Sequence, residues 1–262
     1  MIREFTYKGT KISYSDEGTG KVLVYIHGFL EEKGMWTSLI TNFKSKYRCI
    51  SIDLFGHGAS ENFGYIHTME EQASMIKSLL DRLKLLRYVL IGHSMGGYIA
   101  LELTKKHPEN IRGLILQNST AYPDSDEKIL NRNRAITAVK ENPTLFVKLA
   151  IPMLFSEKNR TINQKEIKAV TSKAINTSTQ GIIAALEGMK IRKNNIEVLS
   201  NPEIPKLMVI GKEDTVLDFN SLIAQTSETD VEVKIFDGGH MSHIENRAEL
   251  ELIYTNFFNT CR

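Results

Sequence analysis

One serine of the sequence stands in a setting that suits a nucleophile. Ser94 lies in the run Gly92-His93-Ser94-Met95-Gly96, which follows an apolar, strand-like stretch and opens a segment with helical spacing. In this G-x-S-x-G pattern a strand reverses sharply into a helix, and glycines are required because side chains would clash there. The hydroxyl of such a nucleophile elbow projects above the sheet, where the helix N-terminus favours negative charge. The pattern predicts attack by a serine hydroxyl, and the alternative is a turn whose serine only caps the helix.

A serine hydroxyl needs a base to take its proton and a third group to orient that base. His240 follows the last strand-like run through Asp237-Gly238-Gly239, a turn that can carry a side chain over the sheet edge. We predict His240 as the base, and His243, three residues further on, is the alternative. His93 adjoins the serine, but in a tight turn its side chain is expected to point elsewhere.

The acid of a catalytic triad belongs at the end of a later strand. The apolar run Leu114–Leu116 is followed by Gln117-Asn118-Ser119, which holds no carboxylate. The run Leu207–Ile210 is followed by Gly211-Lys212-Glu213-Asp214, so we predict Asp214 as the acid and keep Glu213 in reserve. The resulting chain order is Ser94, Asp214, His240, which is the order expected for a nucleophile elbow on an α/β sheet.

The negatively charged oxygen of a tetrahedral intermediate needs hydrogen-bond donors, which form an oxyanion hole. The backbone N–H of Met95, at the start of the predicted helix, is one candidate. The second is the N–H of Phe29 in the loop His27-Gly28-Phe29-Leu30, which follows the apolar run Val22–Ile26. The alternative is that His27-Gly28 only turns the chain.

Strand-like and helix-like segments alternate along the chain and must position these residues. A hairpin, Phe5–Tyr7 with Lys11–Ser15, is expected first. Helices are expected at Gly34–Phe43, from the capping box at Thr68, at Met95–Lys106 and at Glu249–Phe258. The buried strands expected between them are Val22–Ile26, Cys49–Ile52, Tyr88–Ile91, Leu114–Leu116, Leu207–Ile210 and Val231–Phe236. This alternation predicts the α/β class, with a mostly parallel sheet of the eight-stranded type flanked by helices.

The segment 123–200 breaks the alternation because it shows only helical patterns, at Ser125–Lys140, Thr144–Phe155 and Gln164–Met189. That is too long for an ordinary connection between two strands. We therefore predict a helical cap at 123–200, inserted into a core made of 1–122 and 201–262.

The sequence resembles the α/β-hydrolase superfamily over essentially its whole length. The resemblance rests on five motifs: His27-Gly28-Phe29, Asp53-Leu54-Phe55-Gly56-His57-Gly58-Ala59-Ser60, Gly92-His93-Ser94-Met95-Gly96-Gly97, Gly211-Lys212-Glu213-Asp214 and Gly239-His240. It implies the α/β-hydrolase fold, a cap that lines the substrate pocket, and an acyl-enzyme resolved by water. Dehalogenases and epoxide hydrolases of this superfamily use an aspartate nucleophile, and Ser94 argues against both.

The resemblance also bears on the substrate. The loop His27–Leu30 followed by Trp36 is similar to that of menaquinone-pathway enzymes that eliminate pyruvate, but Tyr98 stands where those enzymes are expected to have arginine. The candidate substrate-pocket residues are Trp36, Phe146 and Met153, and the alternative for the cap residues is packing within the cap. An apolar cap without an obvious charged cluster favours uncharged substrates.

We therefore expect a serine esterase, a hydrolase that cleaves a small, mostly uncharged carboxylic ester, a lactone or a thioester through an acyl-enzyme intermediate. One alternative with the same triad is a carbon–carbon bond hydrolase or a pyruvate-eliminating synthase of the menaquinone-pathway type. Another, of a different class, is a hydrolase-like receptor for a small molecule with slow turnover.

Composition bears on partners and location. The 33 Lys and Arg against 31 Asp and Glu give a formal charge of +2, which argues against a nucleic-acid partner. Cys49 and Cys261 have neither a CxxC spacing nor a nearby histidine cluster, so no metal site and no redox role are expected. No cofactor is expected either, because the predicted triad supplies its own base and electrophile. Met1–Phe5 lacks the apolar core of a signal peptide, and the apolar stretch Leu145–Phe155 is too short to span a bilayer. The expectation is a cytoplasmic monomer or homodimer without a membrane partner.

Overall fold

The apolar runs that predict strands form one eight-stranded sheet in the computed structural model, which describes residues 2–261. The strands are β1 (Ile2–Tyr7), β2 (Thr10–Glu17), β3 (Lys21–Ile26), β4 (Tyr47–Ile52), β5 (Tyr88–His93), β6 (Ile111–Gln117), β7 (Lys206–Gly211) and β8 (Glu232–Phe236). Their order across the sheet is β1-β2-β4-β3-β5-β6-β7-β8. The pairs β1–β2 and β2–β4 are antiparallel, and all the others are parallel. The predicted fold class and the opening hairpin are thereby confirmed.

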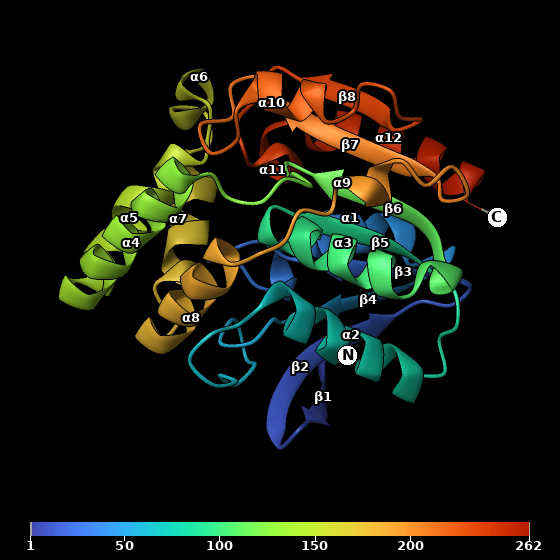
Figure 1. Cartoon of the computed structure of the whole chain (residues 1–262), viewed down its shortest axis with the longest axis horizontal. Coiled ribbons are helices and arrows are strands. Elements are labelled where there is room, and N and C mark those ends of the chain that lie inside the picture. The colour runs from blue at the N-terminus through green and yellow to red at the C-terminus, as the bar shows by residue number, and fades with distance from the viewer. Residues whose placement is uncertain (1, 262) are drawn as a thin grey trace.

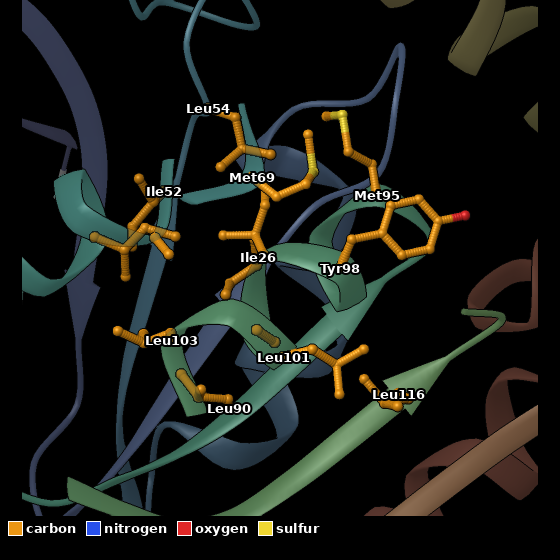
Figure 2. Packing of buried hydrophobic residues seen from close by; sticks show 14 of the residues in the cluster. Ile26, Ile52, Leu54, Met69, Leu90, Met95, Tyr98, Leu101, Leu103 and Leu116 are labelled. Atoms are coloured by element: carbon orange, nitrogen blue, oxygen red, sulfur yellow. The ribbon is translucent and has the colours of Figure 1, made fainter. Parts of the chain in front are cut away.

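Helices cover both faces of this sheet, which explains why its central strands are apolar throughout. The core helices are η1 (Lys33–Trp36), α1 (Thr37–Phe43), α2 (Met69–Arg82), α3 (Met95–Lys106), η2 (Pro108–Asn110), α10 (Phe219–Ala224), α11 (Ser242–Glu245) and α12 (Arg247–Thr260). Residues of α2 and α3 share the larger core cluster with Ile26 and Leu90, and Figure 2 shows this packing. Residues of α1 and α12 share the second cluster with Tyr25 and Ile91, the strand neighbours that point to the opposite face.

Between β6 and β7 the described chain holds six helices and no strand. They are α4 (Asp126–Glu141), α5 (Pro143–Met153), α6 (Glu157–Arg160), α7 (Gln164–Ala174), α8 (Thr179–Lys190) and α9 (Ile196–Leu199). Most of them gather beyond one side of the sheet, with α4 and α5 outermost (Figure 1). The segment 123–200, which holds these helices, is called the cap below. The helical pattern predicted over Gln164–Met189 is not one continuous helix, because the chain turns between α7 and α8. Ser178 caps α8 by accepting a hydrogen bond from the Gly181 N–H at 3.0 Å.

None of the helices within residues 2–261 has the length and apolar character that crossing a membrane requires.

Candidate active site

The turn from β5 into α3 holds Ser94 in a backbone conformation that few residues adopt. Its φ of 50° and ψ of −117° lie outside the regions that side chains normally allow. The Ser94 N–H donates to the Gln117 carbonyl oxygen at 3.0 Å, and the Ser119 hydroxyl donates to the Ser94 carbonyl oxygen at 2.8 Å. These bonds to the end of β6 and the segment after it hold the strained residue in place.

The glycines of this turn are required by close backbone approach. A Cβ on Gly92 would lie 2.5 Å from the Gly96 carbonyl oxygen. A Cβ on Gly96 would collide with the carbonyl oxygens of Ile26 and His27, at the end of β3. The turn therefore packs directly against the loop that was predicted to complete the oxyanion hole.

His240 and Asp214 are hydrogen-bonded to each other. The Nδ1 of His240 lies 2.7 Å from the Asp214 Oδ2, and both side chains are buried. The second Asp214 oxygen accepts the N–H groups of Val216 and Leu217 at 2.8 and 3.0 Å. Burial acts to raise the pKa of Asp214, but His240 and these N–H groups lower it overall. Asp214 is therefore an ionised carboxylate that holds the imidazole of His240 by its Nδ1–H.

The segment that carries His240 reaches the nucleophile turn through His93. The Nε2 of His93 donates to the His240 carbonyl oxygen at 2.9 Å, and the centroids of the two rings are 5.0 Å apart. His240 also donates its backbone N–H to the Leu154 carbonyl oxygen of the cap at 2.7 Å. The side chain of Asn118 donates to Asp214 Oδ2 at 3.2 Å, at the strand end where no carboxylate was found. The structure thus brings Ser94, Asp214 and His240 to one edge of the sheet.

The two alternatives for the triad lie elsewhere. His243 is buried, with its Nδ1 3.4 Å from the amide nitrogen of Gln117, and burial lowers its pKa to about 3. Glu213 forms an exposed ion pair with Lys158 at 2.7 Å. In the described chain, neither side chain forms a hydrogen bond or ion pair with Asp214 or His240.

The loop after β3 passes beside Ser94. A Cβ on Gly28 would lie 3.2 Å from the Ser94 Cβ. Within residues 2–261 the Phe29 N–H donates no hydrogen bond, and the Met95 N–H is at the first position of α3, where a helix N–H has no partner of its own. Within the described chain, neither of these two N–H groups is therefore used by another hydrogen bond.

Glu31 is a buried acid that the sequence analysis missed. Its Oε2 accepts the Gly28 N–H at 2.8 Å and lies 2.7 Å from the Nδ1 of His93. Both nitrogens of His93 thus face acceptors, a carboxylate and the His240 carbonyl, so both carry a proton. A charged residue in a loop is usually exposed, and nothing in the residue pattern marks this one as buried.

The pKa values of the Glu31–His93 pair agree with a buried ion pair. Burial acts to raise the pKa of Glu31, but the charge of His93 lowers it to about 2. Burial likewise acts to lower the pKa of His93, yet Glu31 raises it overall. The pair joins the loop after β3, the nucleophile turn and the His240 segment in one charged network.

A hollow of about 1070 Å³ lies beside Asp214, between core and cap. Tyr98 and Leu217 line it from the core, and Asp124, Arg132 and Arg192 line it from the cap. The carboxylate of Asp124 accepts hydrogen bonds from both guanidinium groups, and Arg192 lies 4.1 Å from the centre of the Tyr98 ring. The expectation of a cap without a charged cluster is therefore wrong.

The three predicted pocket residues do not line this hollow. Trp36 has no exposed surface and packs in the second core cluster, where its ring centroid lies 5.4 Å from that of Tyr25. The prediction that Trp36 contacts substrate is wrong, because its side chain is fully buried in this cluster. Phe146 packs against the larger core cluster, and Met153 is 51% exposed at the end of α5.

No group of three or more His, Cys, Asp and Glu side chains in residues 2–261 is arranged to hold a metal ion.

The chain is similar in sequence to a known family and to curated proteins. A family model described as the alpha/beta hydrolase fold matches residues 21–247. The haloalkane dehalogenase 2 of Mycobacterium bovis is 30% identical over 122 residues, which cover 46% of this chain and 43% of the relative. The match thus spans less than half of the length of that curated relative.

Solved structures match over the whole length. A thermophilic esterase from Thermogutta terrifontis is 26% identical, with a TM-score of 0.90 and 100% of both chains covered. An enol-lactonase from Burkholderia xenovorans is 20% identical, with a TM-score of 0.90 over 98% of this chain and 100% of the other. At 20% identity the lactonase shows a common fold alone.

Proposed function

We propose that this chain, which belongs to the alpha/beta hydrolase fold family, hydrolyses carboxylic esters through an acyl-enzyme formed on Ser94. The observation that carries the proposal is the Asp214–His240 hydrogen bond of 2.7 Å, on a segment tied to the strained Ser94 turn. A serine hydroxyl is a weak nucleophile without a base, and this arrangement supplies the base together with the group that orients it.

The proposed reaction follows from the hydrogen bonds. Because the Nδ1–H of His240 is donated to Asp214, the Nε2 is the nitrogen that accepts the Ser94 proton. The Ser94 oxygen then attacks the ester carbonyl carbon, and the negative oxygen is stabilised by the N–H groups of Phe29 and Met95. The protonated His240 returns its proton to the departing alcohol, which leaves an acyl group on Ser94. Water, deprotonated by His240, releases the acid in the same way.

The nucleophile itself favours esters over alkyl halides. A hydrolytic dehalogenation needs a carboxylate nucleophile, whose alkyl ester is then cleaved by water, and position 94 is a serine. The whole-length similarity to the Thermogutta esterase supports the same choice. Asp124, Arg132 and Arg192 line the hollow beside Asp214, so the proposed substrates include anionic as well as neutral esters.

Turnover of a panel of p-nitrophenyl esters with increasing acyl length tests the proposal. Ser94→Ala should abolish turnover, whereas Ser172→Ala, at an exposed serine of α7, should leave kcat unchanged. Absence of turnover across the panel, or turnover that survives in Ser94→Ala, would contradict the proposal.

A further inference from the structure

The outer face of α5 exposes a continuous apolar stripe. Leu145, Leu149 and Met153 are 50%, 64% and 51% exposed, and they recur at every fourth residue. Side chains at this spacing are neighbours along one helix face. Val147 and Ile151, on the opposite face, are buried in the core cluster. The helix is therefore apolar on both faces, and only one of them is covered.

Single exposed apolar side chains are ordinary, but three in a row along one helix face are not. Leu252 of α12, for example, is also 64% exposed, but it stands alone. The residues four positions before and after it are Ala248 and Asn256, which do not extend an apolar row. A contiguous exposed apolar surface marks a place where the molecule meets an apolar partner.

Charge separates the cap from the rest of the chain. Segment 123–200 holds 13 Lys and Arg against 8 Asp and Glu, a formal charge of +5. The rest of the chain holds 20 against 23, a formal charge of −3. On α5 itself the exposed Lys148 lies between Leu145 and Leu149, and the helix has no acidic residue. The partner of this face is expected to be apolar within and negatively charged at its surface.

The stripe ends at the active site. The Thr215 hydroxyl, one residue after Asp214, donates to the Met153 carbonyl oxygen at 2.6 Å. The next residue, Leu154, accepts the His240 N–H at 2.7 Å. In Figure 1, α5 runs along the outer side of the cap, away from the sheet. A surface that binds α5 would therefore lie close to the segments that carry Asp214 and His240.

We propose that the outer face of α5 docks the protein on an anionic lipid surface, from which the site takes lipid-borne esters. A helix face that exposes leucine and methionine beside a lysine can bury these apolar side chains at the boundary between headgroups and acyl chains while the lysine stays among the headgroups. Anionic headgroups attract a basic segment. Two copies of this cap, each with a formal charge of +5, would instead repel one another, so a lipid surface is favoured over a second copy as the partner. This proposal departs from the expectation of no membrane partner, which rested on the lack of a signal-peptide core and of a spanning segment. The choice of lipid-borne esters rests on the proposed function.

Co-sedimentation with vesicles tests the docking independently of catalysis. The probes are vesicles of phosphatidylcholine alone and of phosphatidylcholine with 30% phosphatidylglycerol, and the protein carries Ser94→Ala so that no lipid is cleaved. We expect binding to the anionic vesicles only. The double variant Leu145→Ser/Leu149→Ser should lose it, and Lys148→Glu should weaken it by on the order of tenfold or more, because two charges change.

Leu252→Ser is the matched control, since it removes an equally exposed leucine from α12. The docking proposal is overturned if the protein with the native α5 does not bind anionic vesicles, or if Leu252→Ser loses binding as much as Leu145→Ser/Leu149→Ser, called the α5 variant below. It is also overturned if the apolar stripe proves to be a dimer interface. An interface between copies would show as a dimer in size-exclusion chromatography that the α5 variant converts to monomer. The urea unfolding midpoint of each variant verifies that it is folded.

Activity measurements then distinguish the membrane docking from the ester hydrolysis. With Ser94 intact, the α5 variant should hydrolyse a dissolved short ester at the native rate and a vesicle-borne ester at least several-fold more slowly. If vesicles bind but no ester in either form is cleaved, the docking stands and the proposed function fails. Equal loss of both activities would contradict a docking role for α5.

Discussion

Replacing Glu31 tests whether a buried ion pair holds the proposed active site together. Glu31→Ala removes the acceptor of the Gly28 N–H and leaves the imidazolium of His93 without its counter-charge. Breaking a buried ion pair by removing one partner costs about 3–5 kcal/mol of folding free energy. Since Glu31 is almost fully buried, little water can replace the lost carboxylate, and we expect a loss within this range. Glu31→Gln keeps an acceptor for Gly28 and should lose less.

Catalysis should respond as well, because Gly28 directly precedes Phe29. A loop that is no longer held on Ser94 misplaces the Phe29 N–H, and losing one oxyanion donor costs about 10²–10³ in kcat. We expect Glu31→Ala to lower kcat by up to about 10²-fold with a smaller change in KM. The double variant Glu31→Gln/His93→Gln should lose less unfolding free energy than the sum of the losses in the two single variants, because no charge is left unpaired in it.

The assays are urea unfolding at pH 7 and ester kinetics, with Glu32→Ala as the control. Glu32 is the next residue, but it forms an exposed pair with Lys173, and such pairs contribute only about 0–1 kcal/mol. If Glu31→Ala and Glu32→Ala are equally stable and equally active, Glu31 does not organise the site.

Two further predictions follow from the same geometry. Asp214→Asn should lower kcat about 10⁴-fold, as it does for the corresponding aspartate of a serine protease, because the amide no longer fixes the proton on His240 Nδ1. Asp81→Asn, in α2 and paired at the surface with Lys77, should leave kcat unchanged, and equal kcat values for the two variants would count against the triad. Burial lowers the pKa of both His57 and His243 to about 3, so below pH 6.5 the unfolded chain binds protons that the folded chain does not. Unfolding free energy should therefore fall by about 2 kcal/mol for each of them between pH 7 and pH 5, and His57→Gln should flatten that slope in urea titrations at the two pH values.

The sequence was most informative where local geometry leaves little choice of residue. The strands β3, β5 and β7 are covered on both faces, and this appears directly as runs of apolar residues. The strained turn at Ser94 demands glycines at two fixed positions, which can be read without a structure. Asp214 and His240 follow because the strand ends limit where an acid and a base can stand. Their partnership could therefore be predicted from chain order.

Side-chain direction in loops and short helices could not be predicted. Trp36 follows the loop after β3 and looks like a pocket residue, but a short 3₁₀ turn directs it into the core. Glu31 precedes the same turn by two residues and is buried although it is charged, because its partners Gly28 and His93 come from two different segments. The break between α7 and α8 was missed because the chain there has neither glycine nor proline. For Glu31, contacts between distant residues decide the outcome, whereas the Ser178 cap and the 3₁₀ turn before Trp36 are short local features that the residue pattern did not separate from their surroundings.

Covalent labelling tests the central claim most directly, namely that Ser94 is an activated nucleophile. The native protein is treated with a fluorophosphonate, digested and sequenced by mass spectrometry, next to Ser94→Ala and Asp214→Asn. We predict stoichiometric modification of the peptide at Ser94, none in Ser94→Ala, and much slower modification in Asp214→Asn. Native protein that is folded but unlabelled at Ser94, or that is labelled equally fast in Asp214→Asn, would contradict the proposed mechanism.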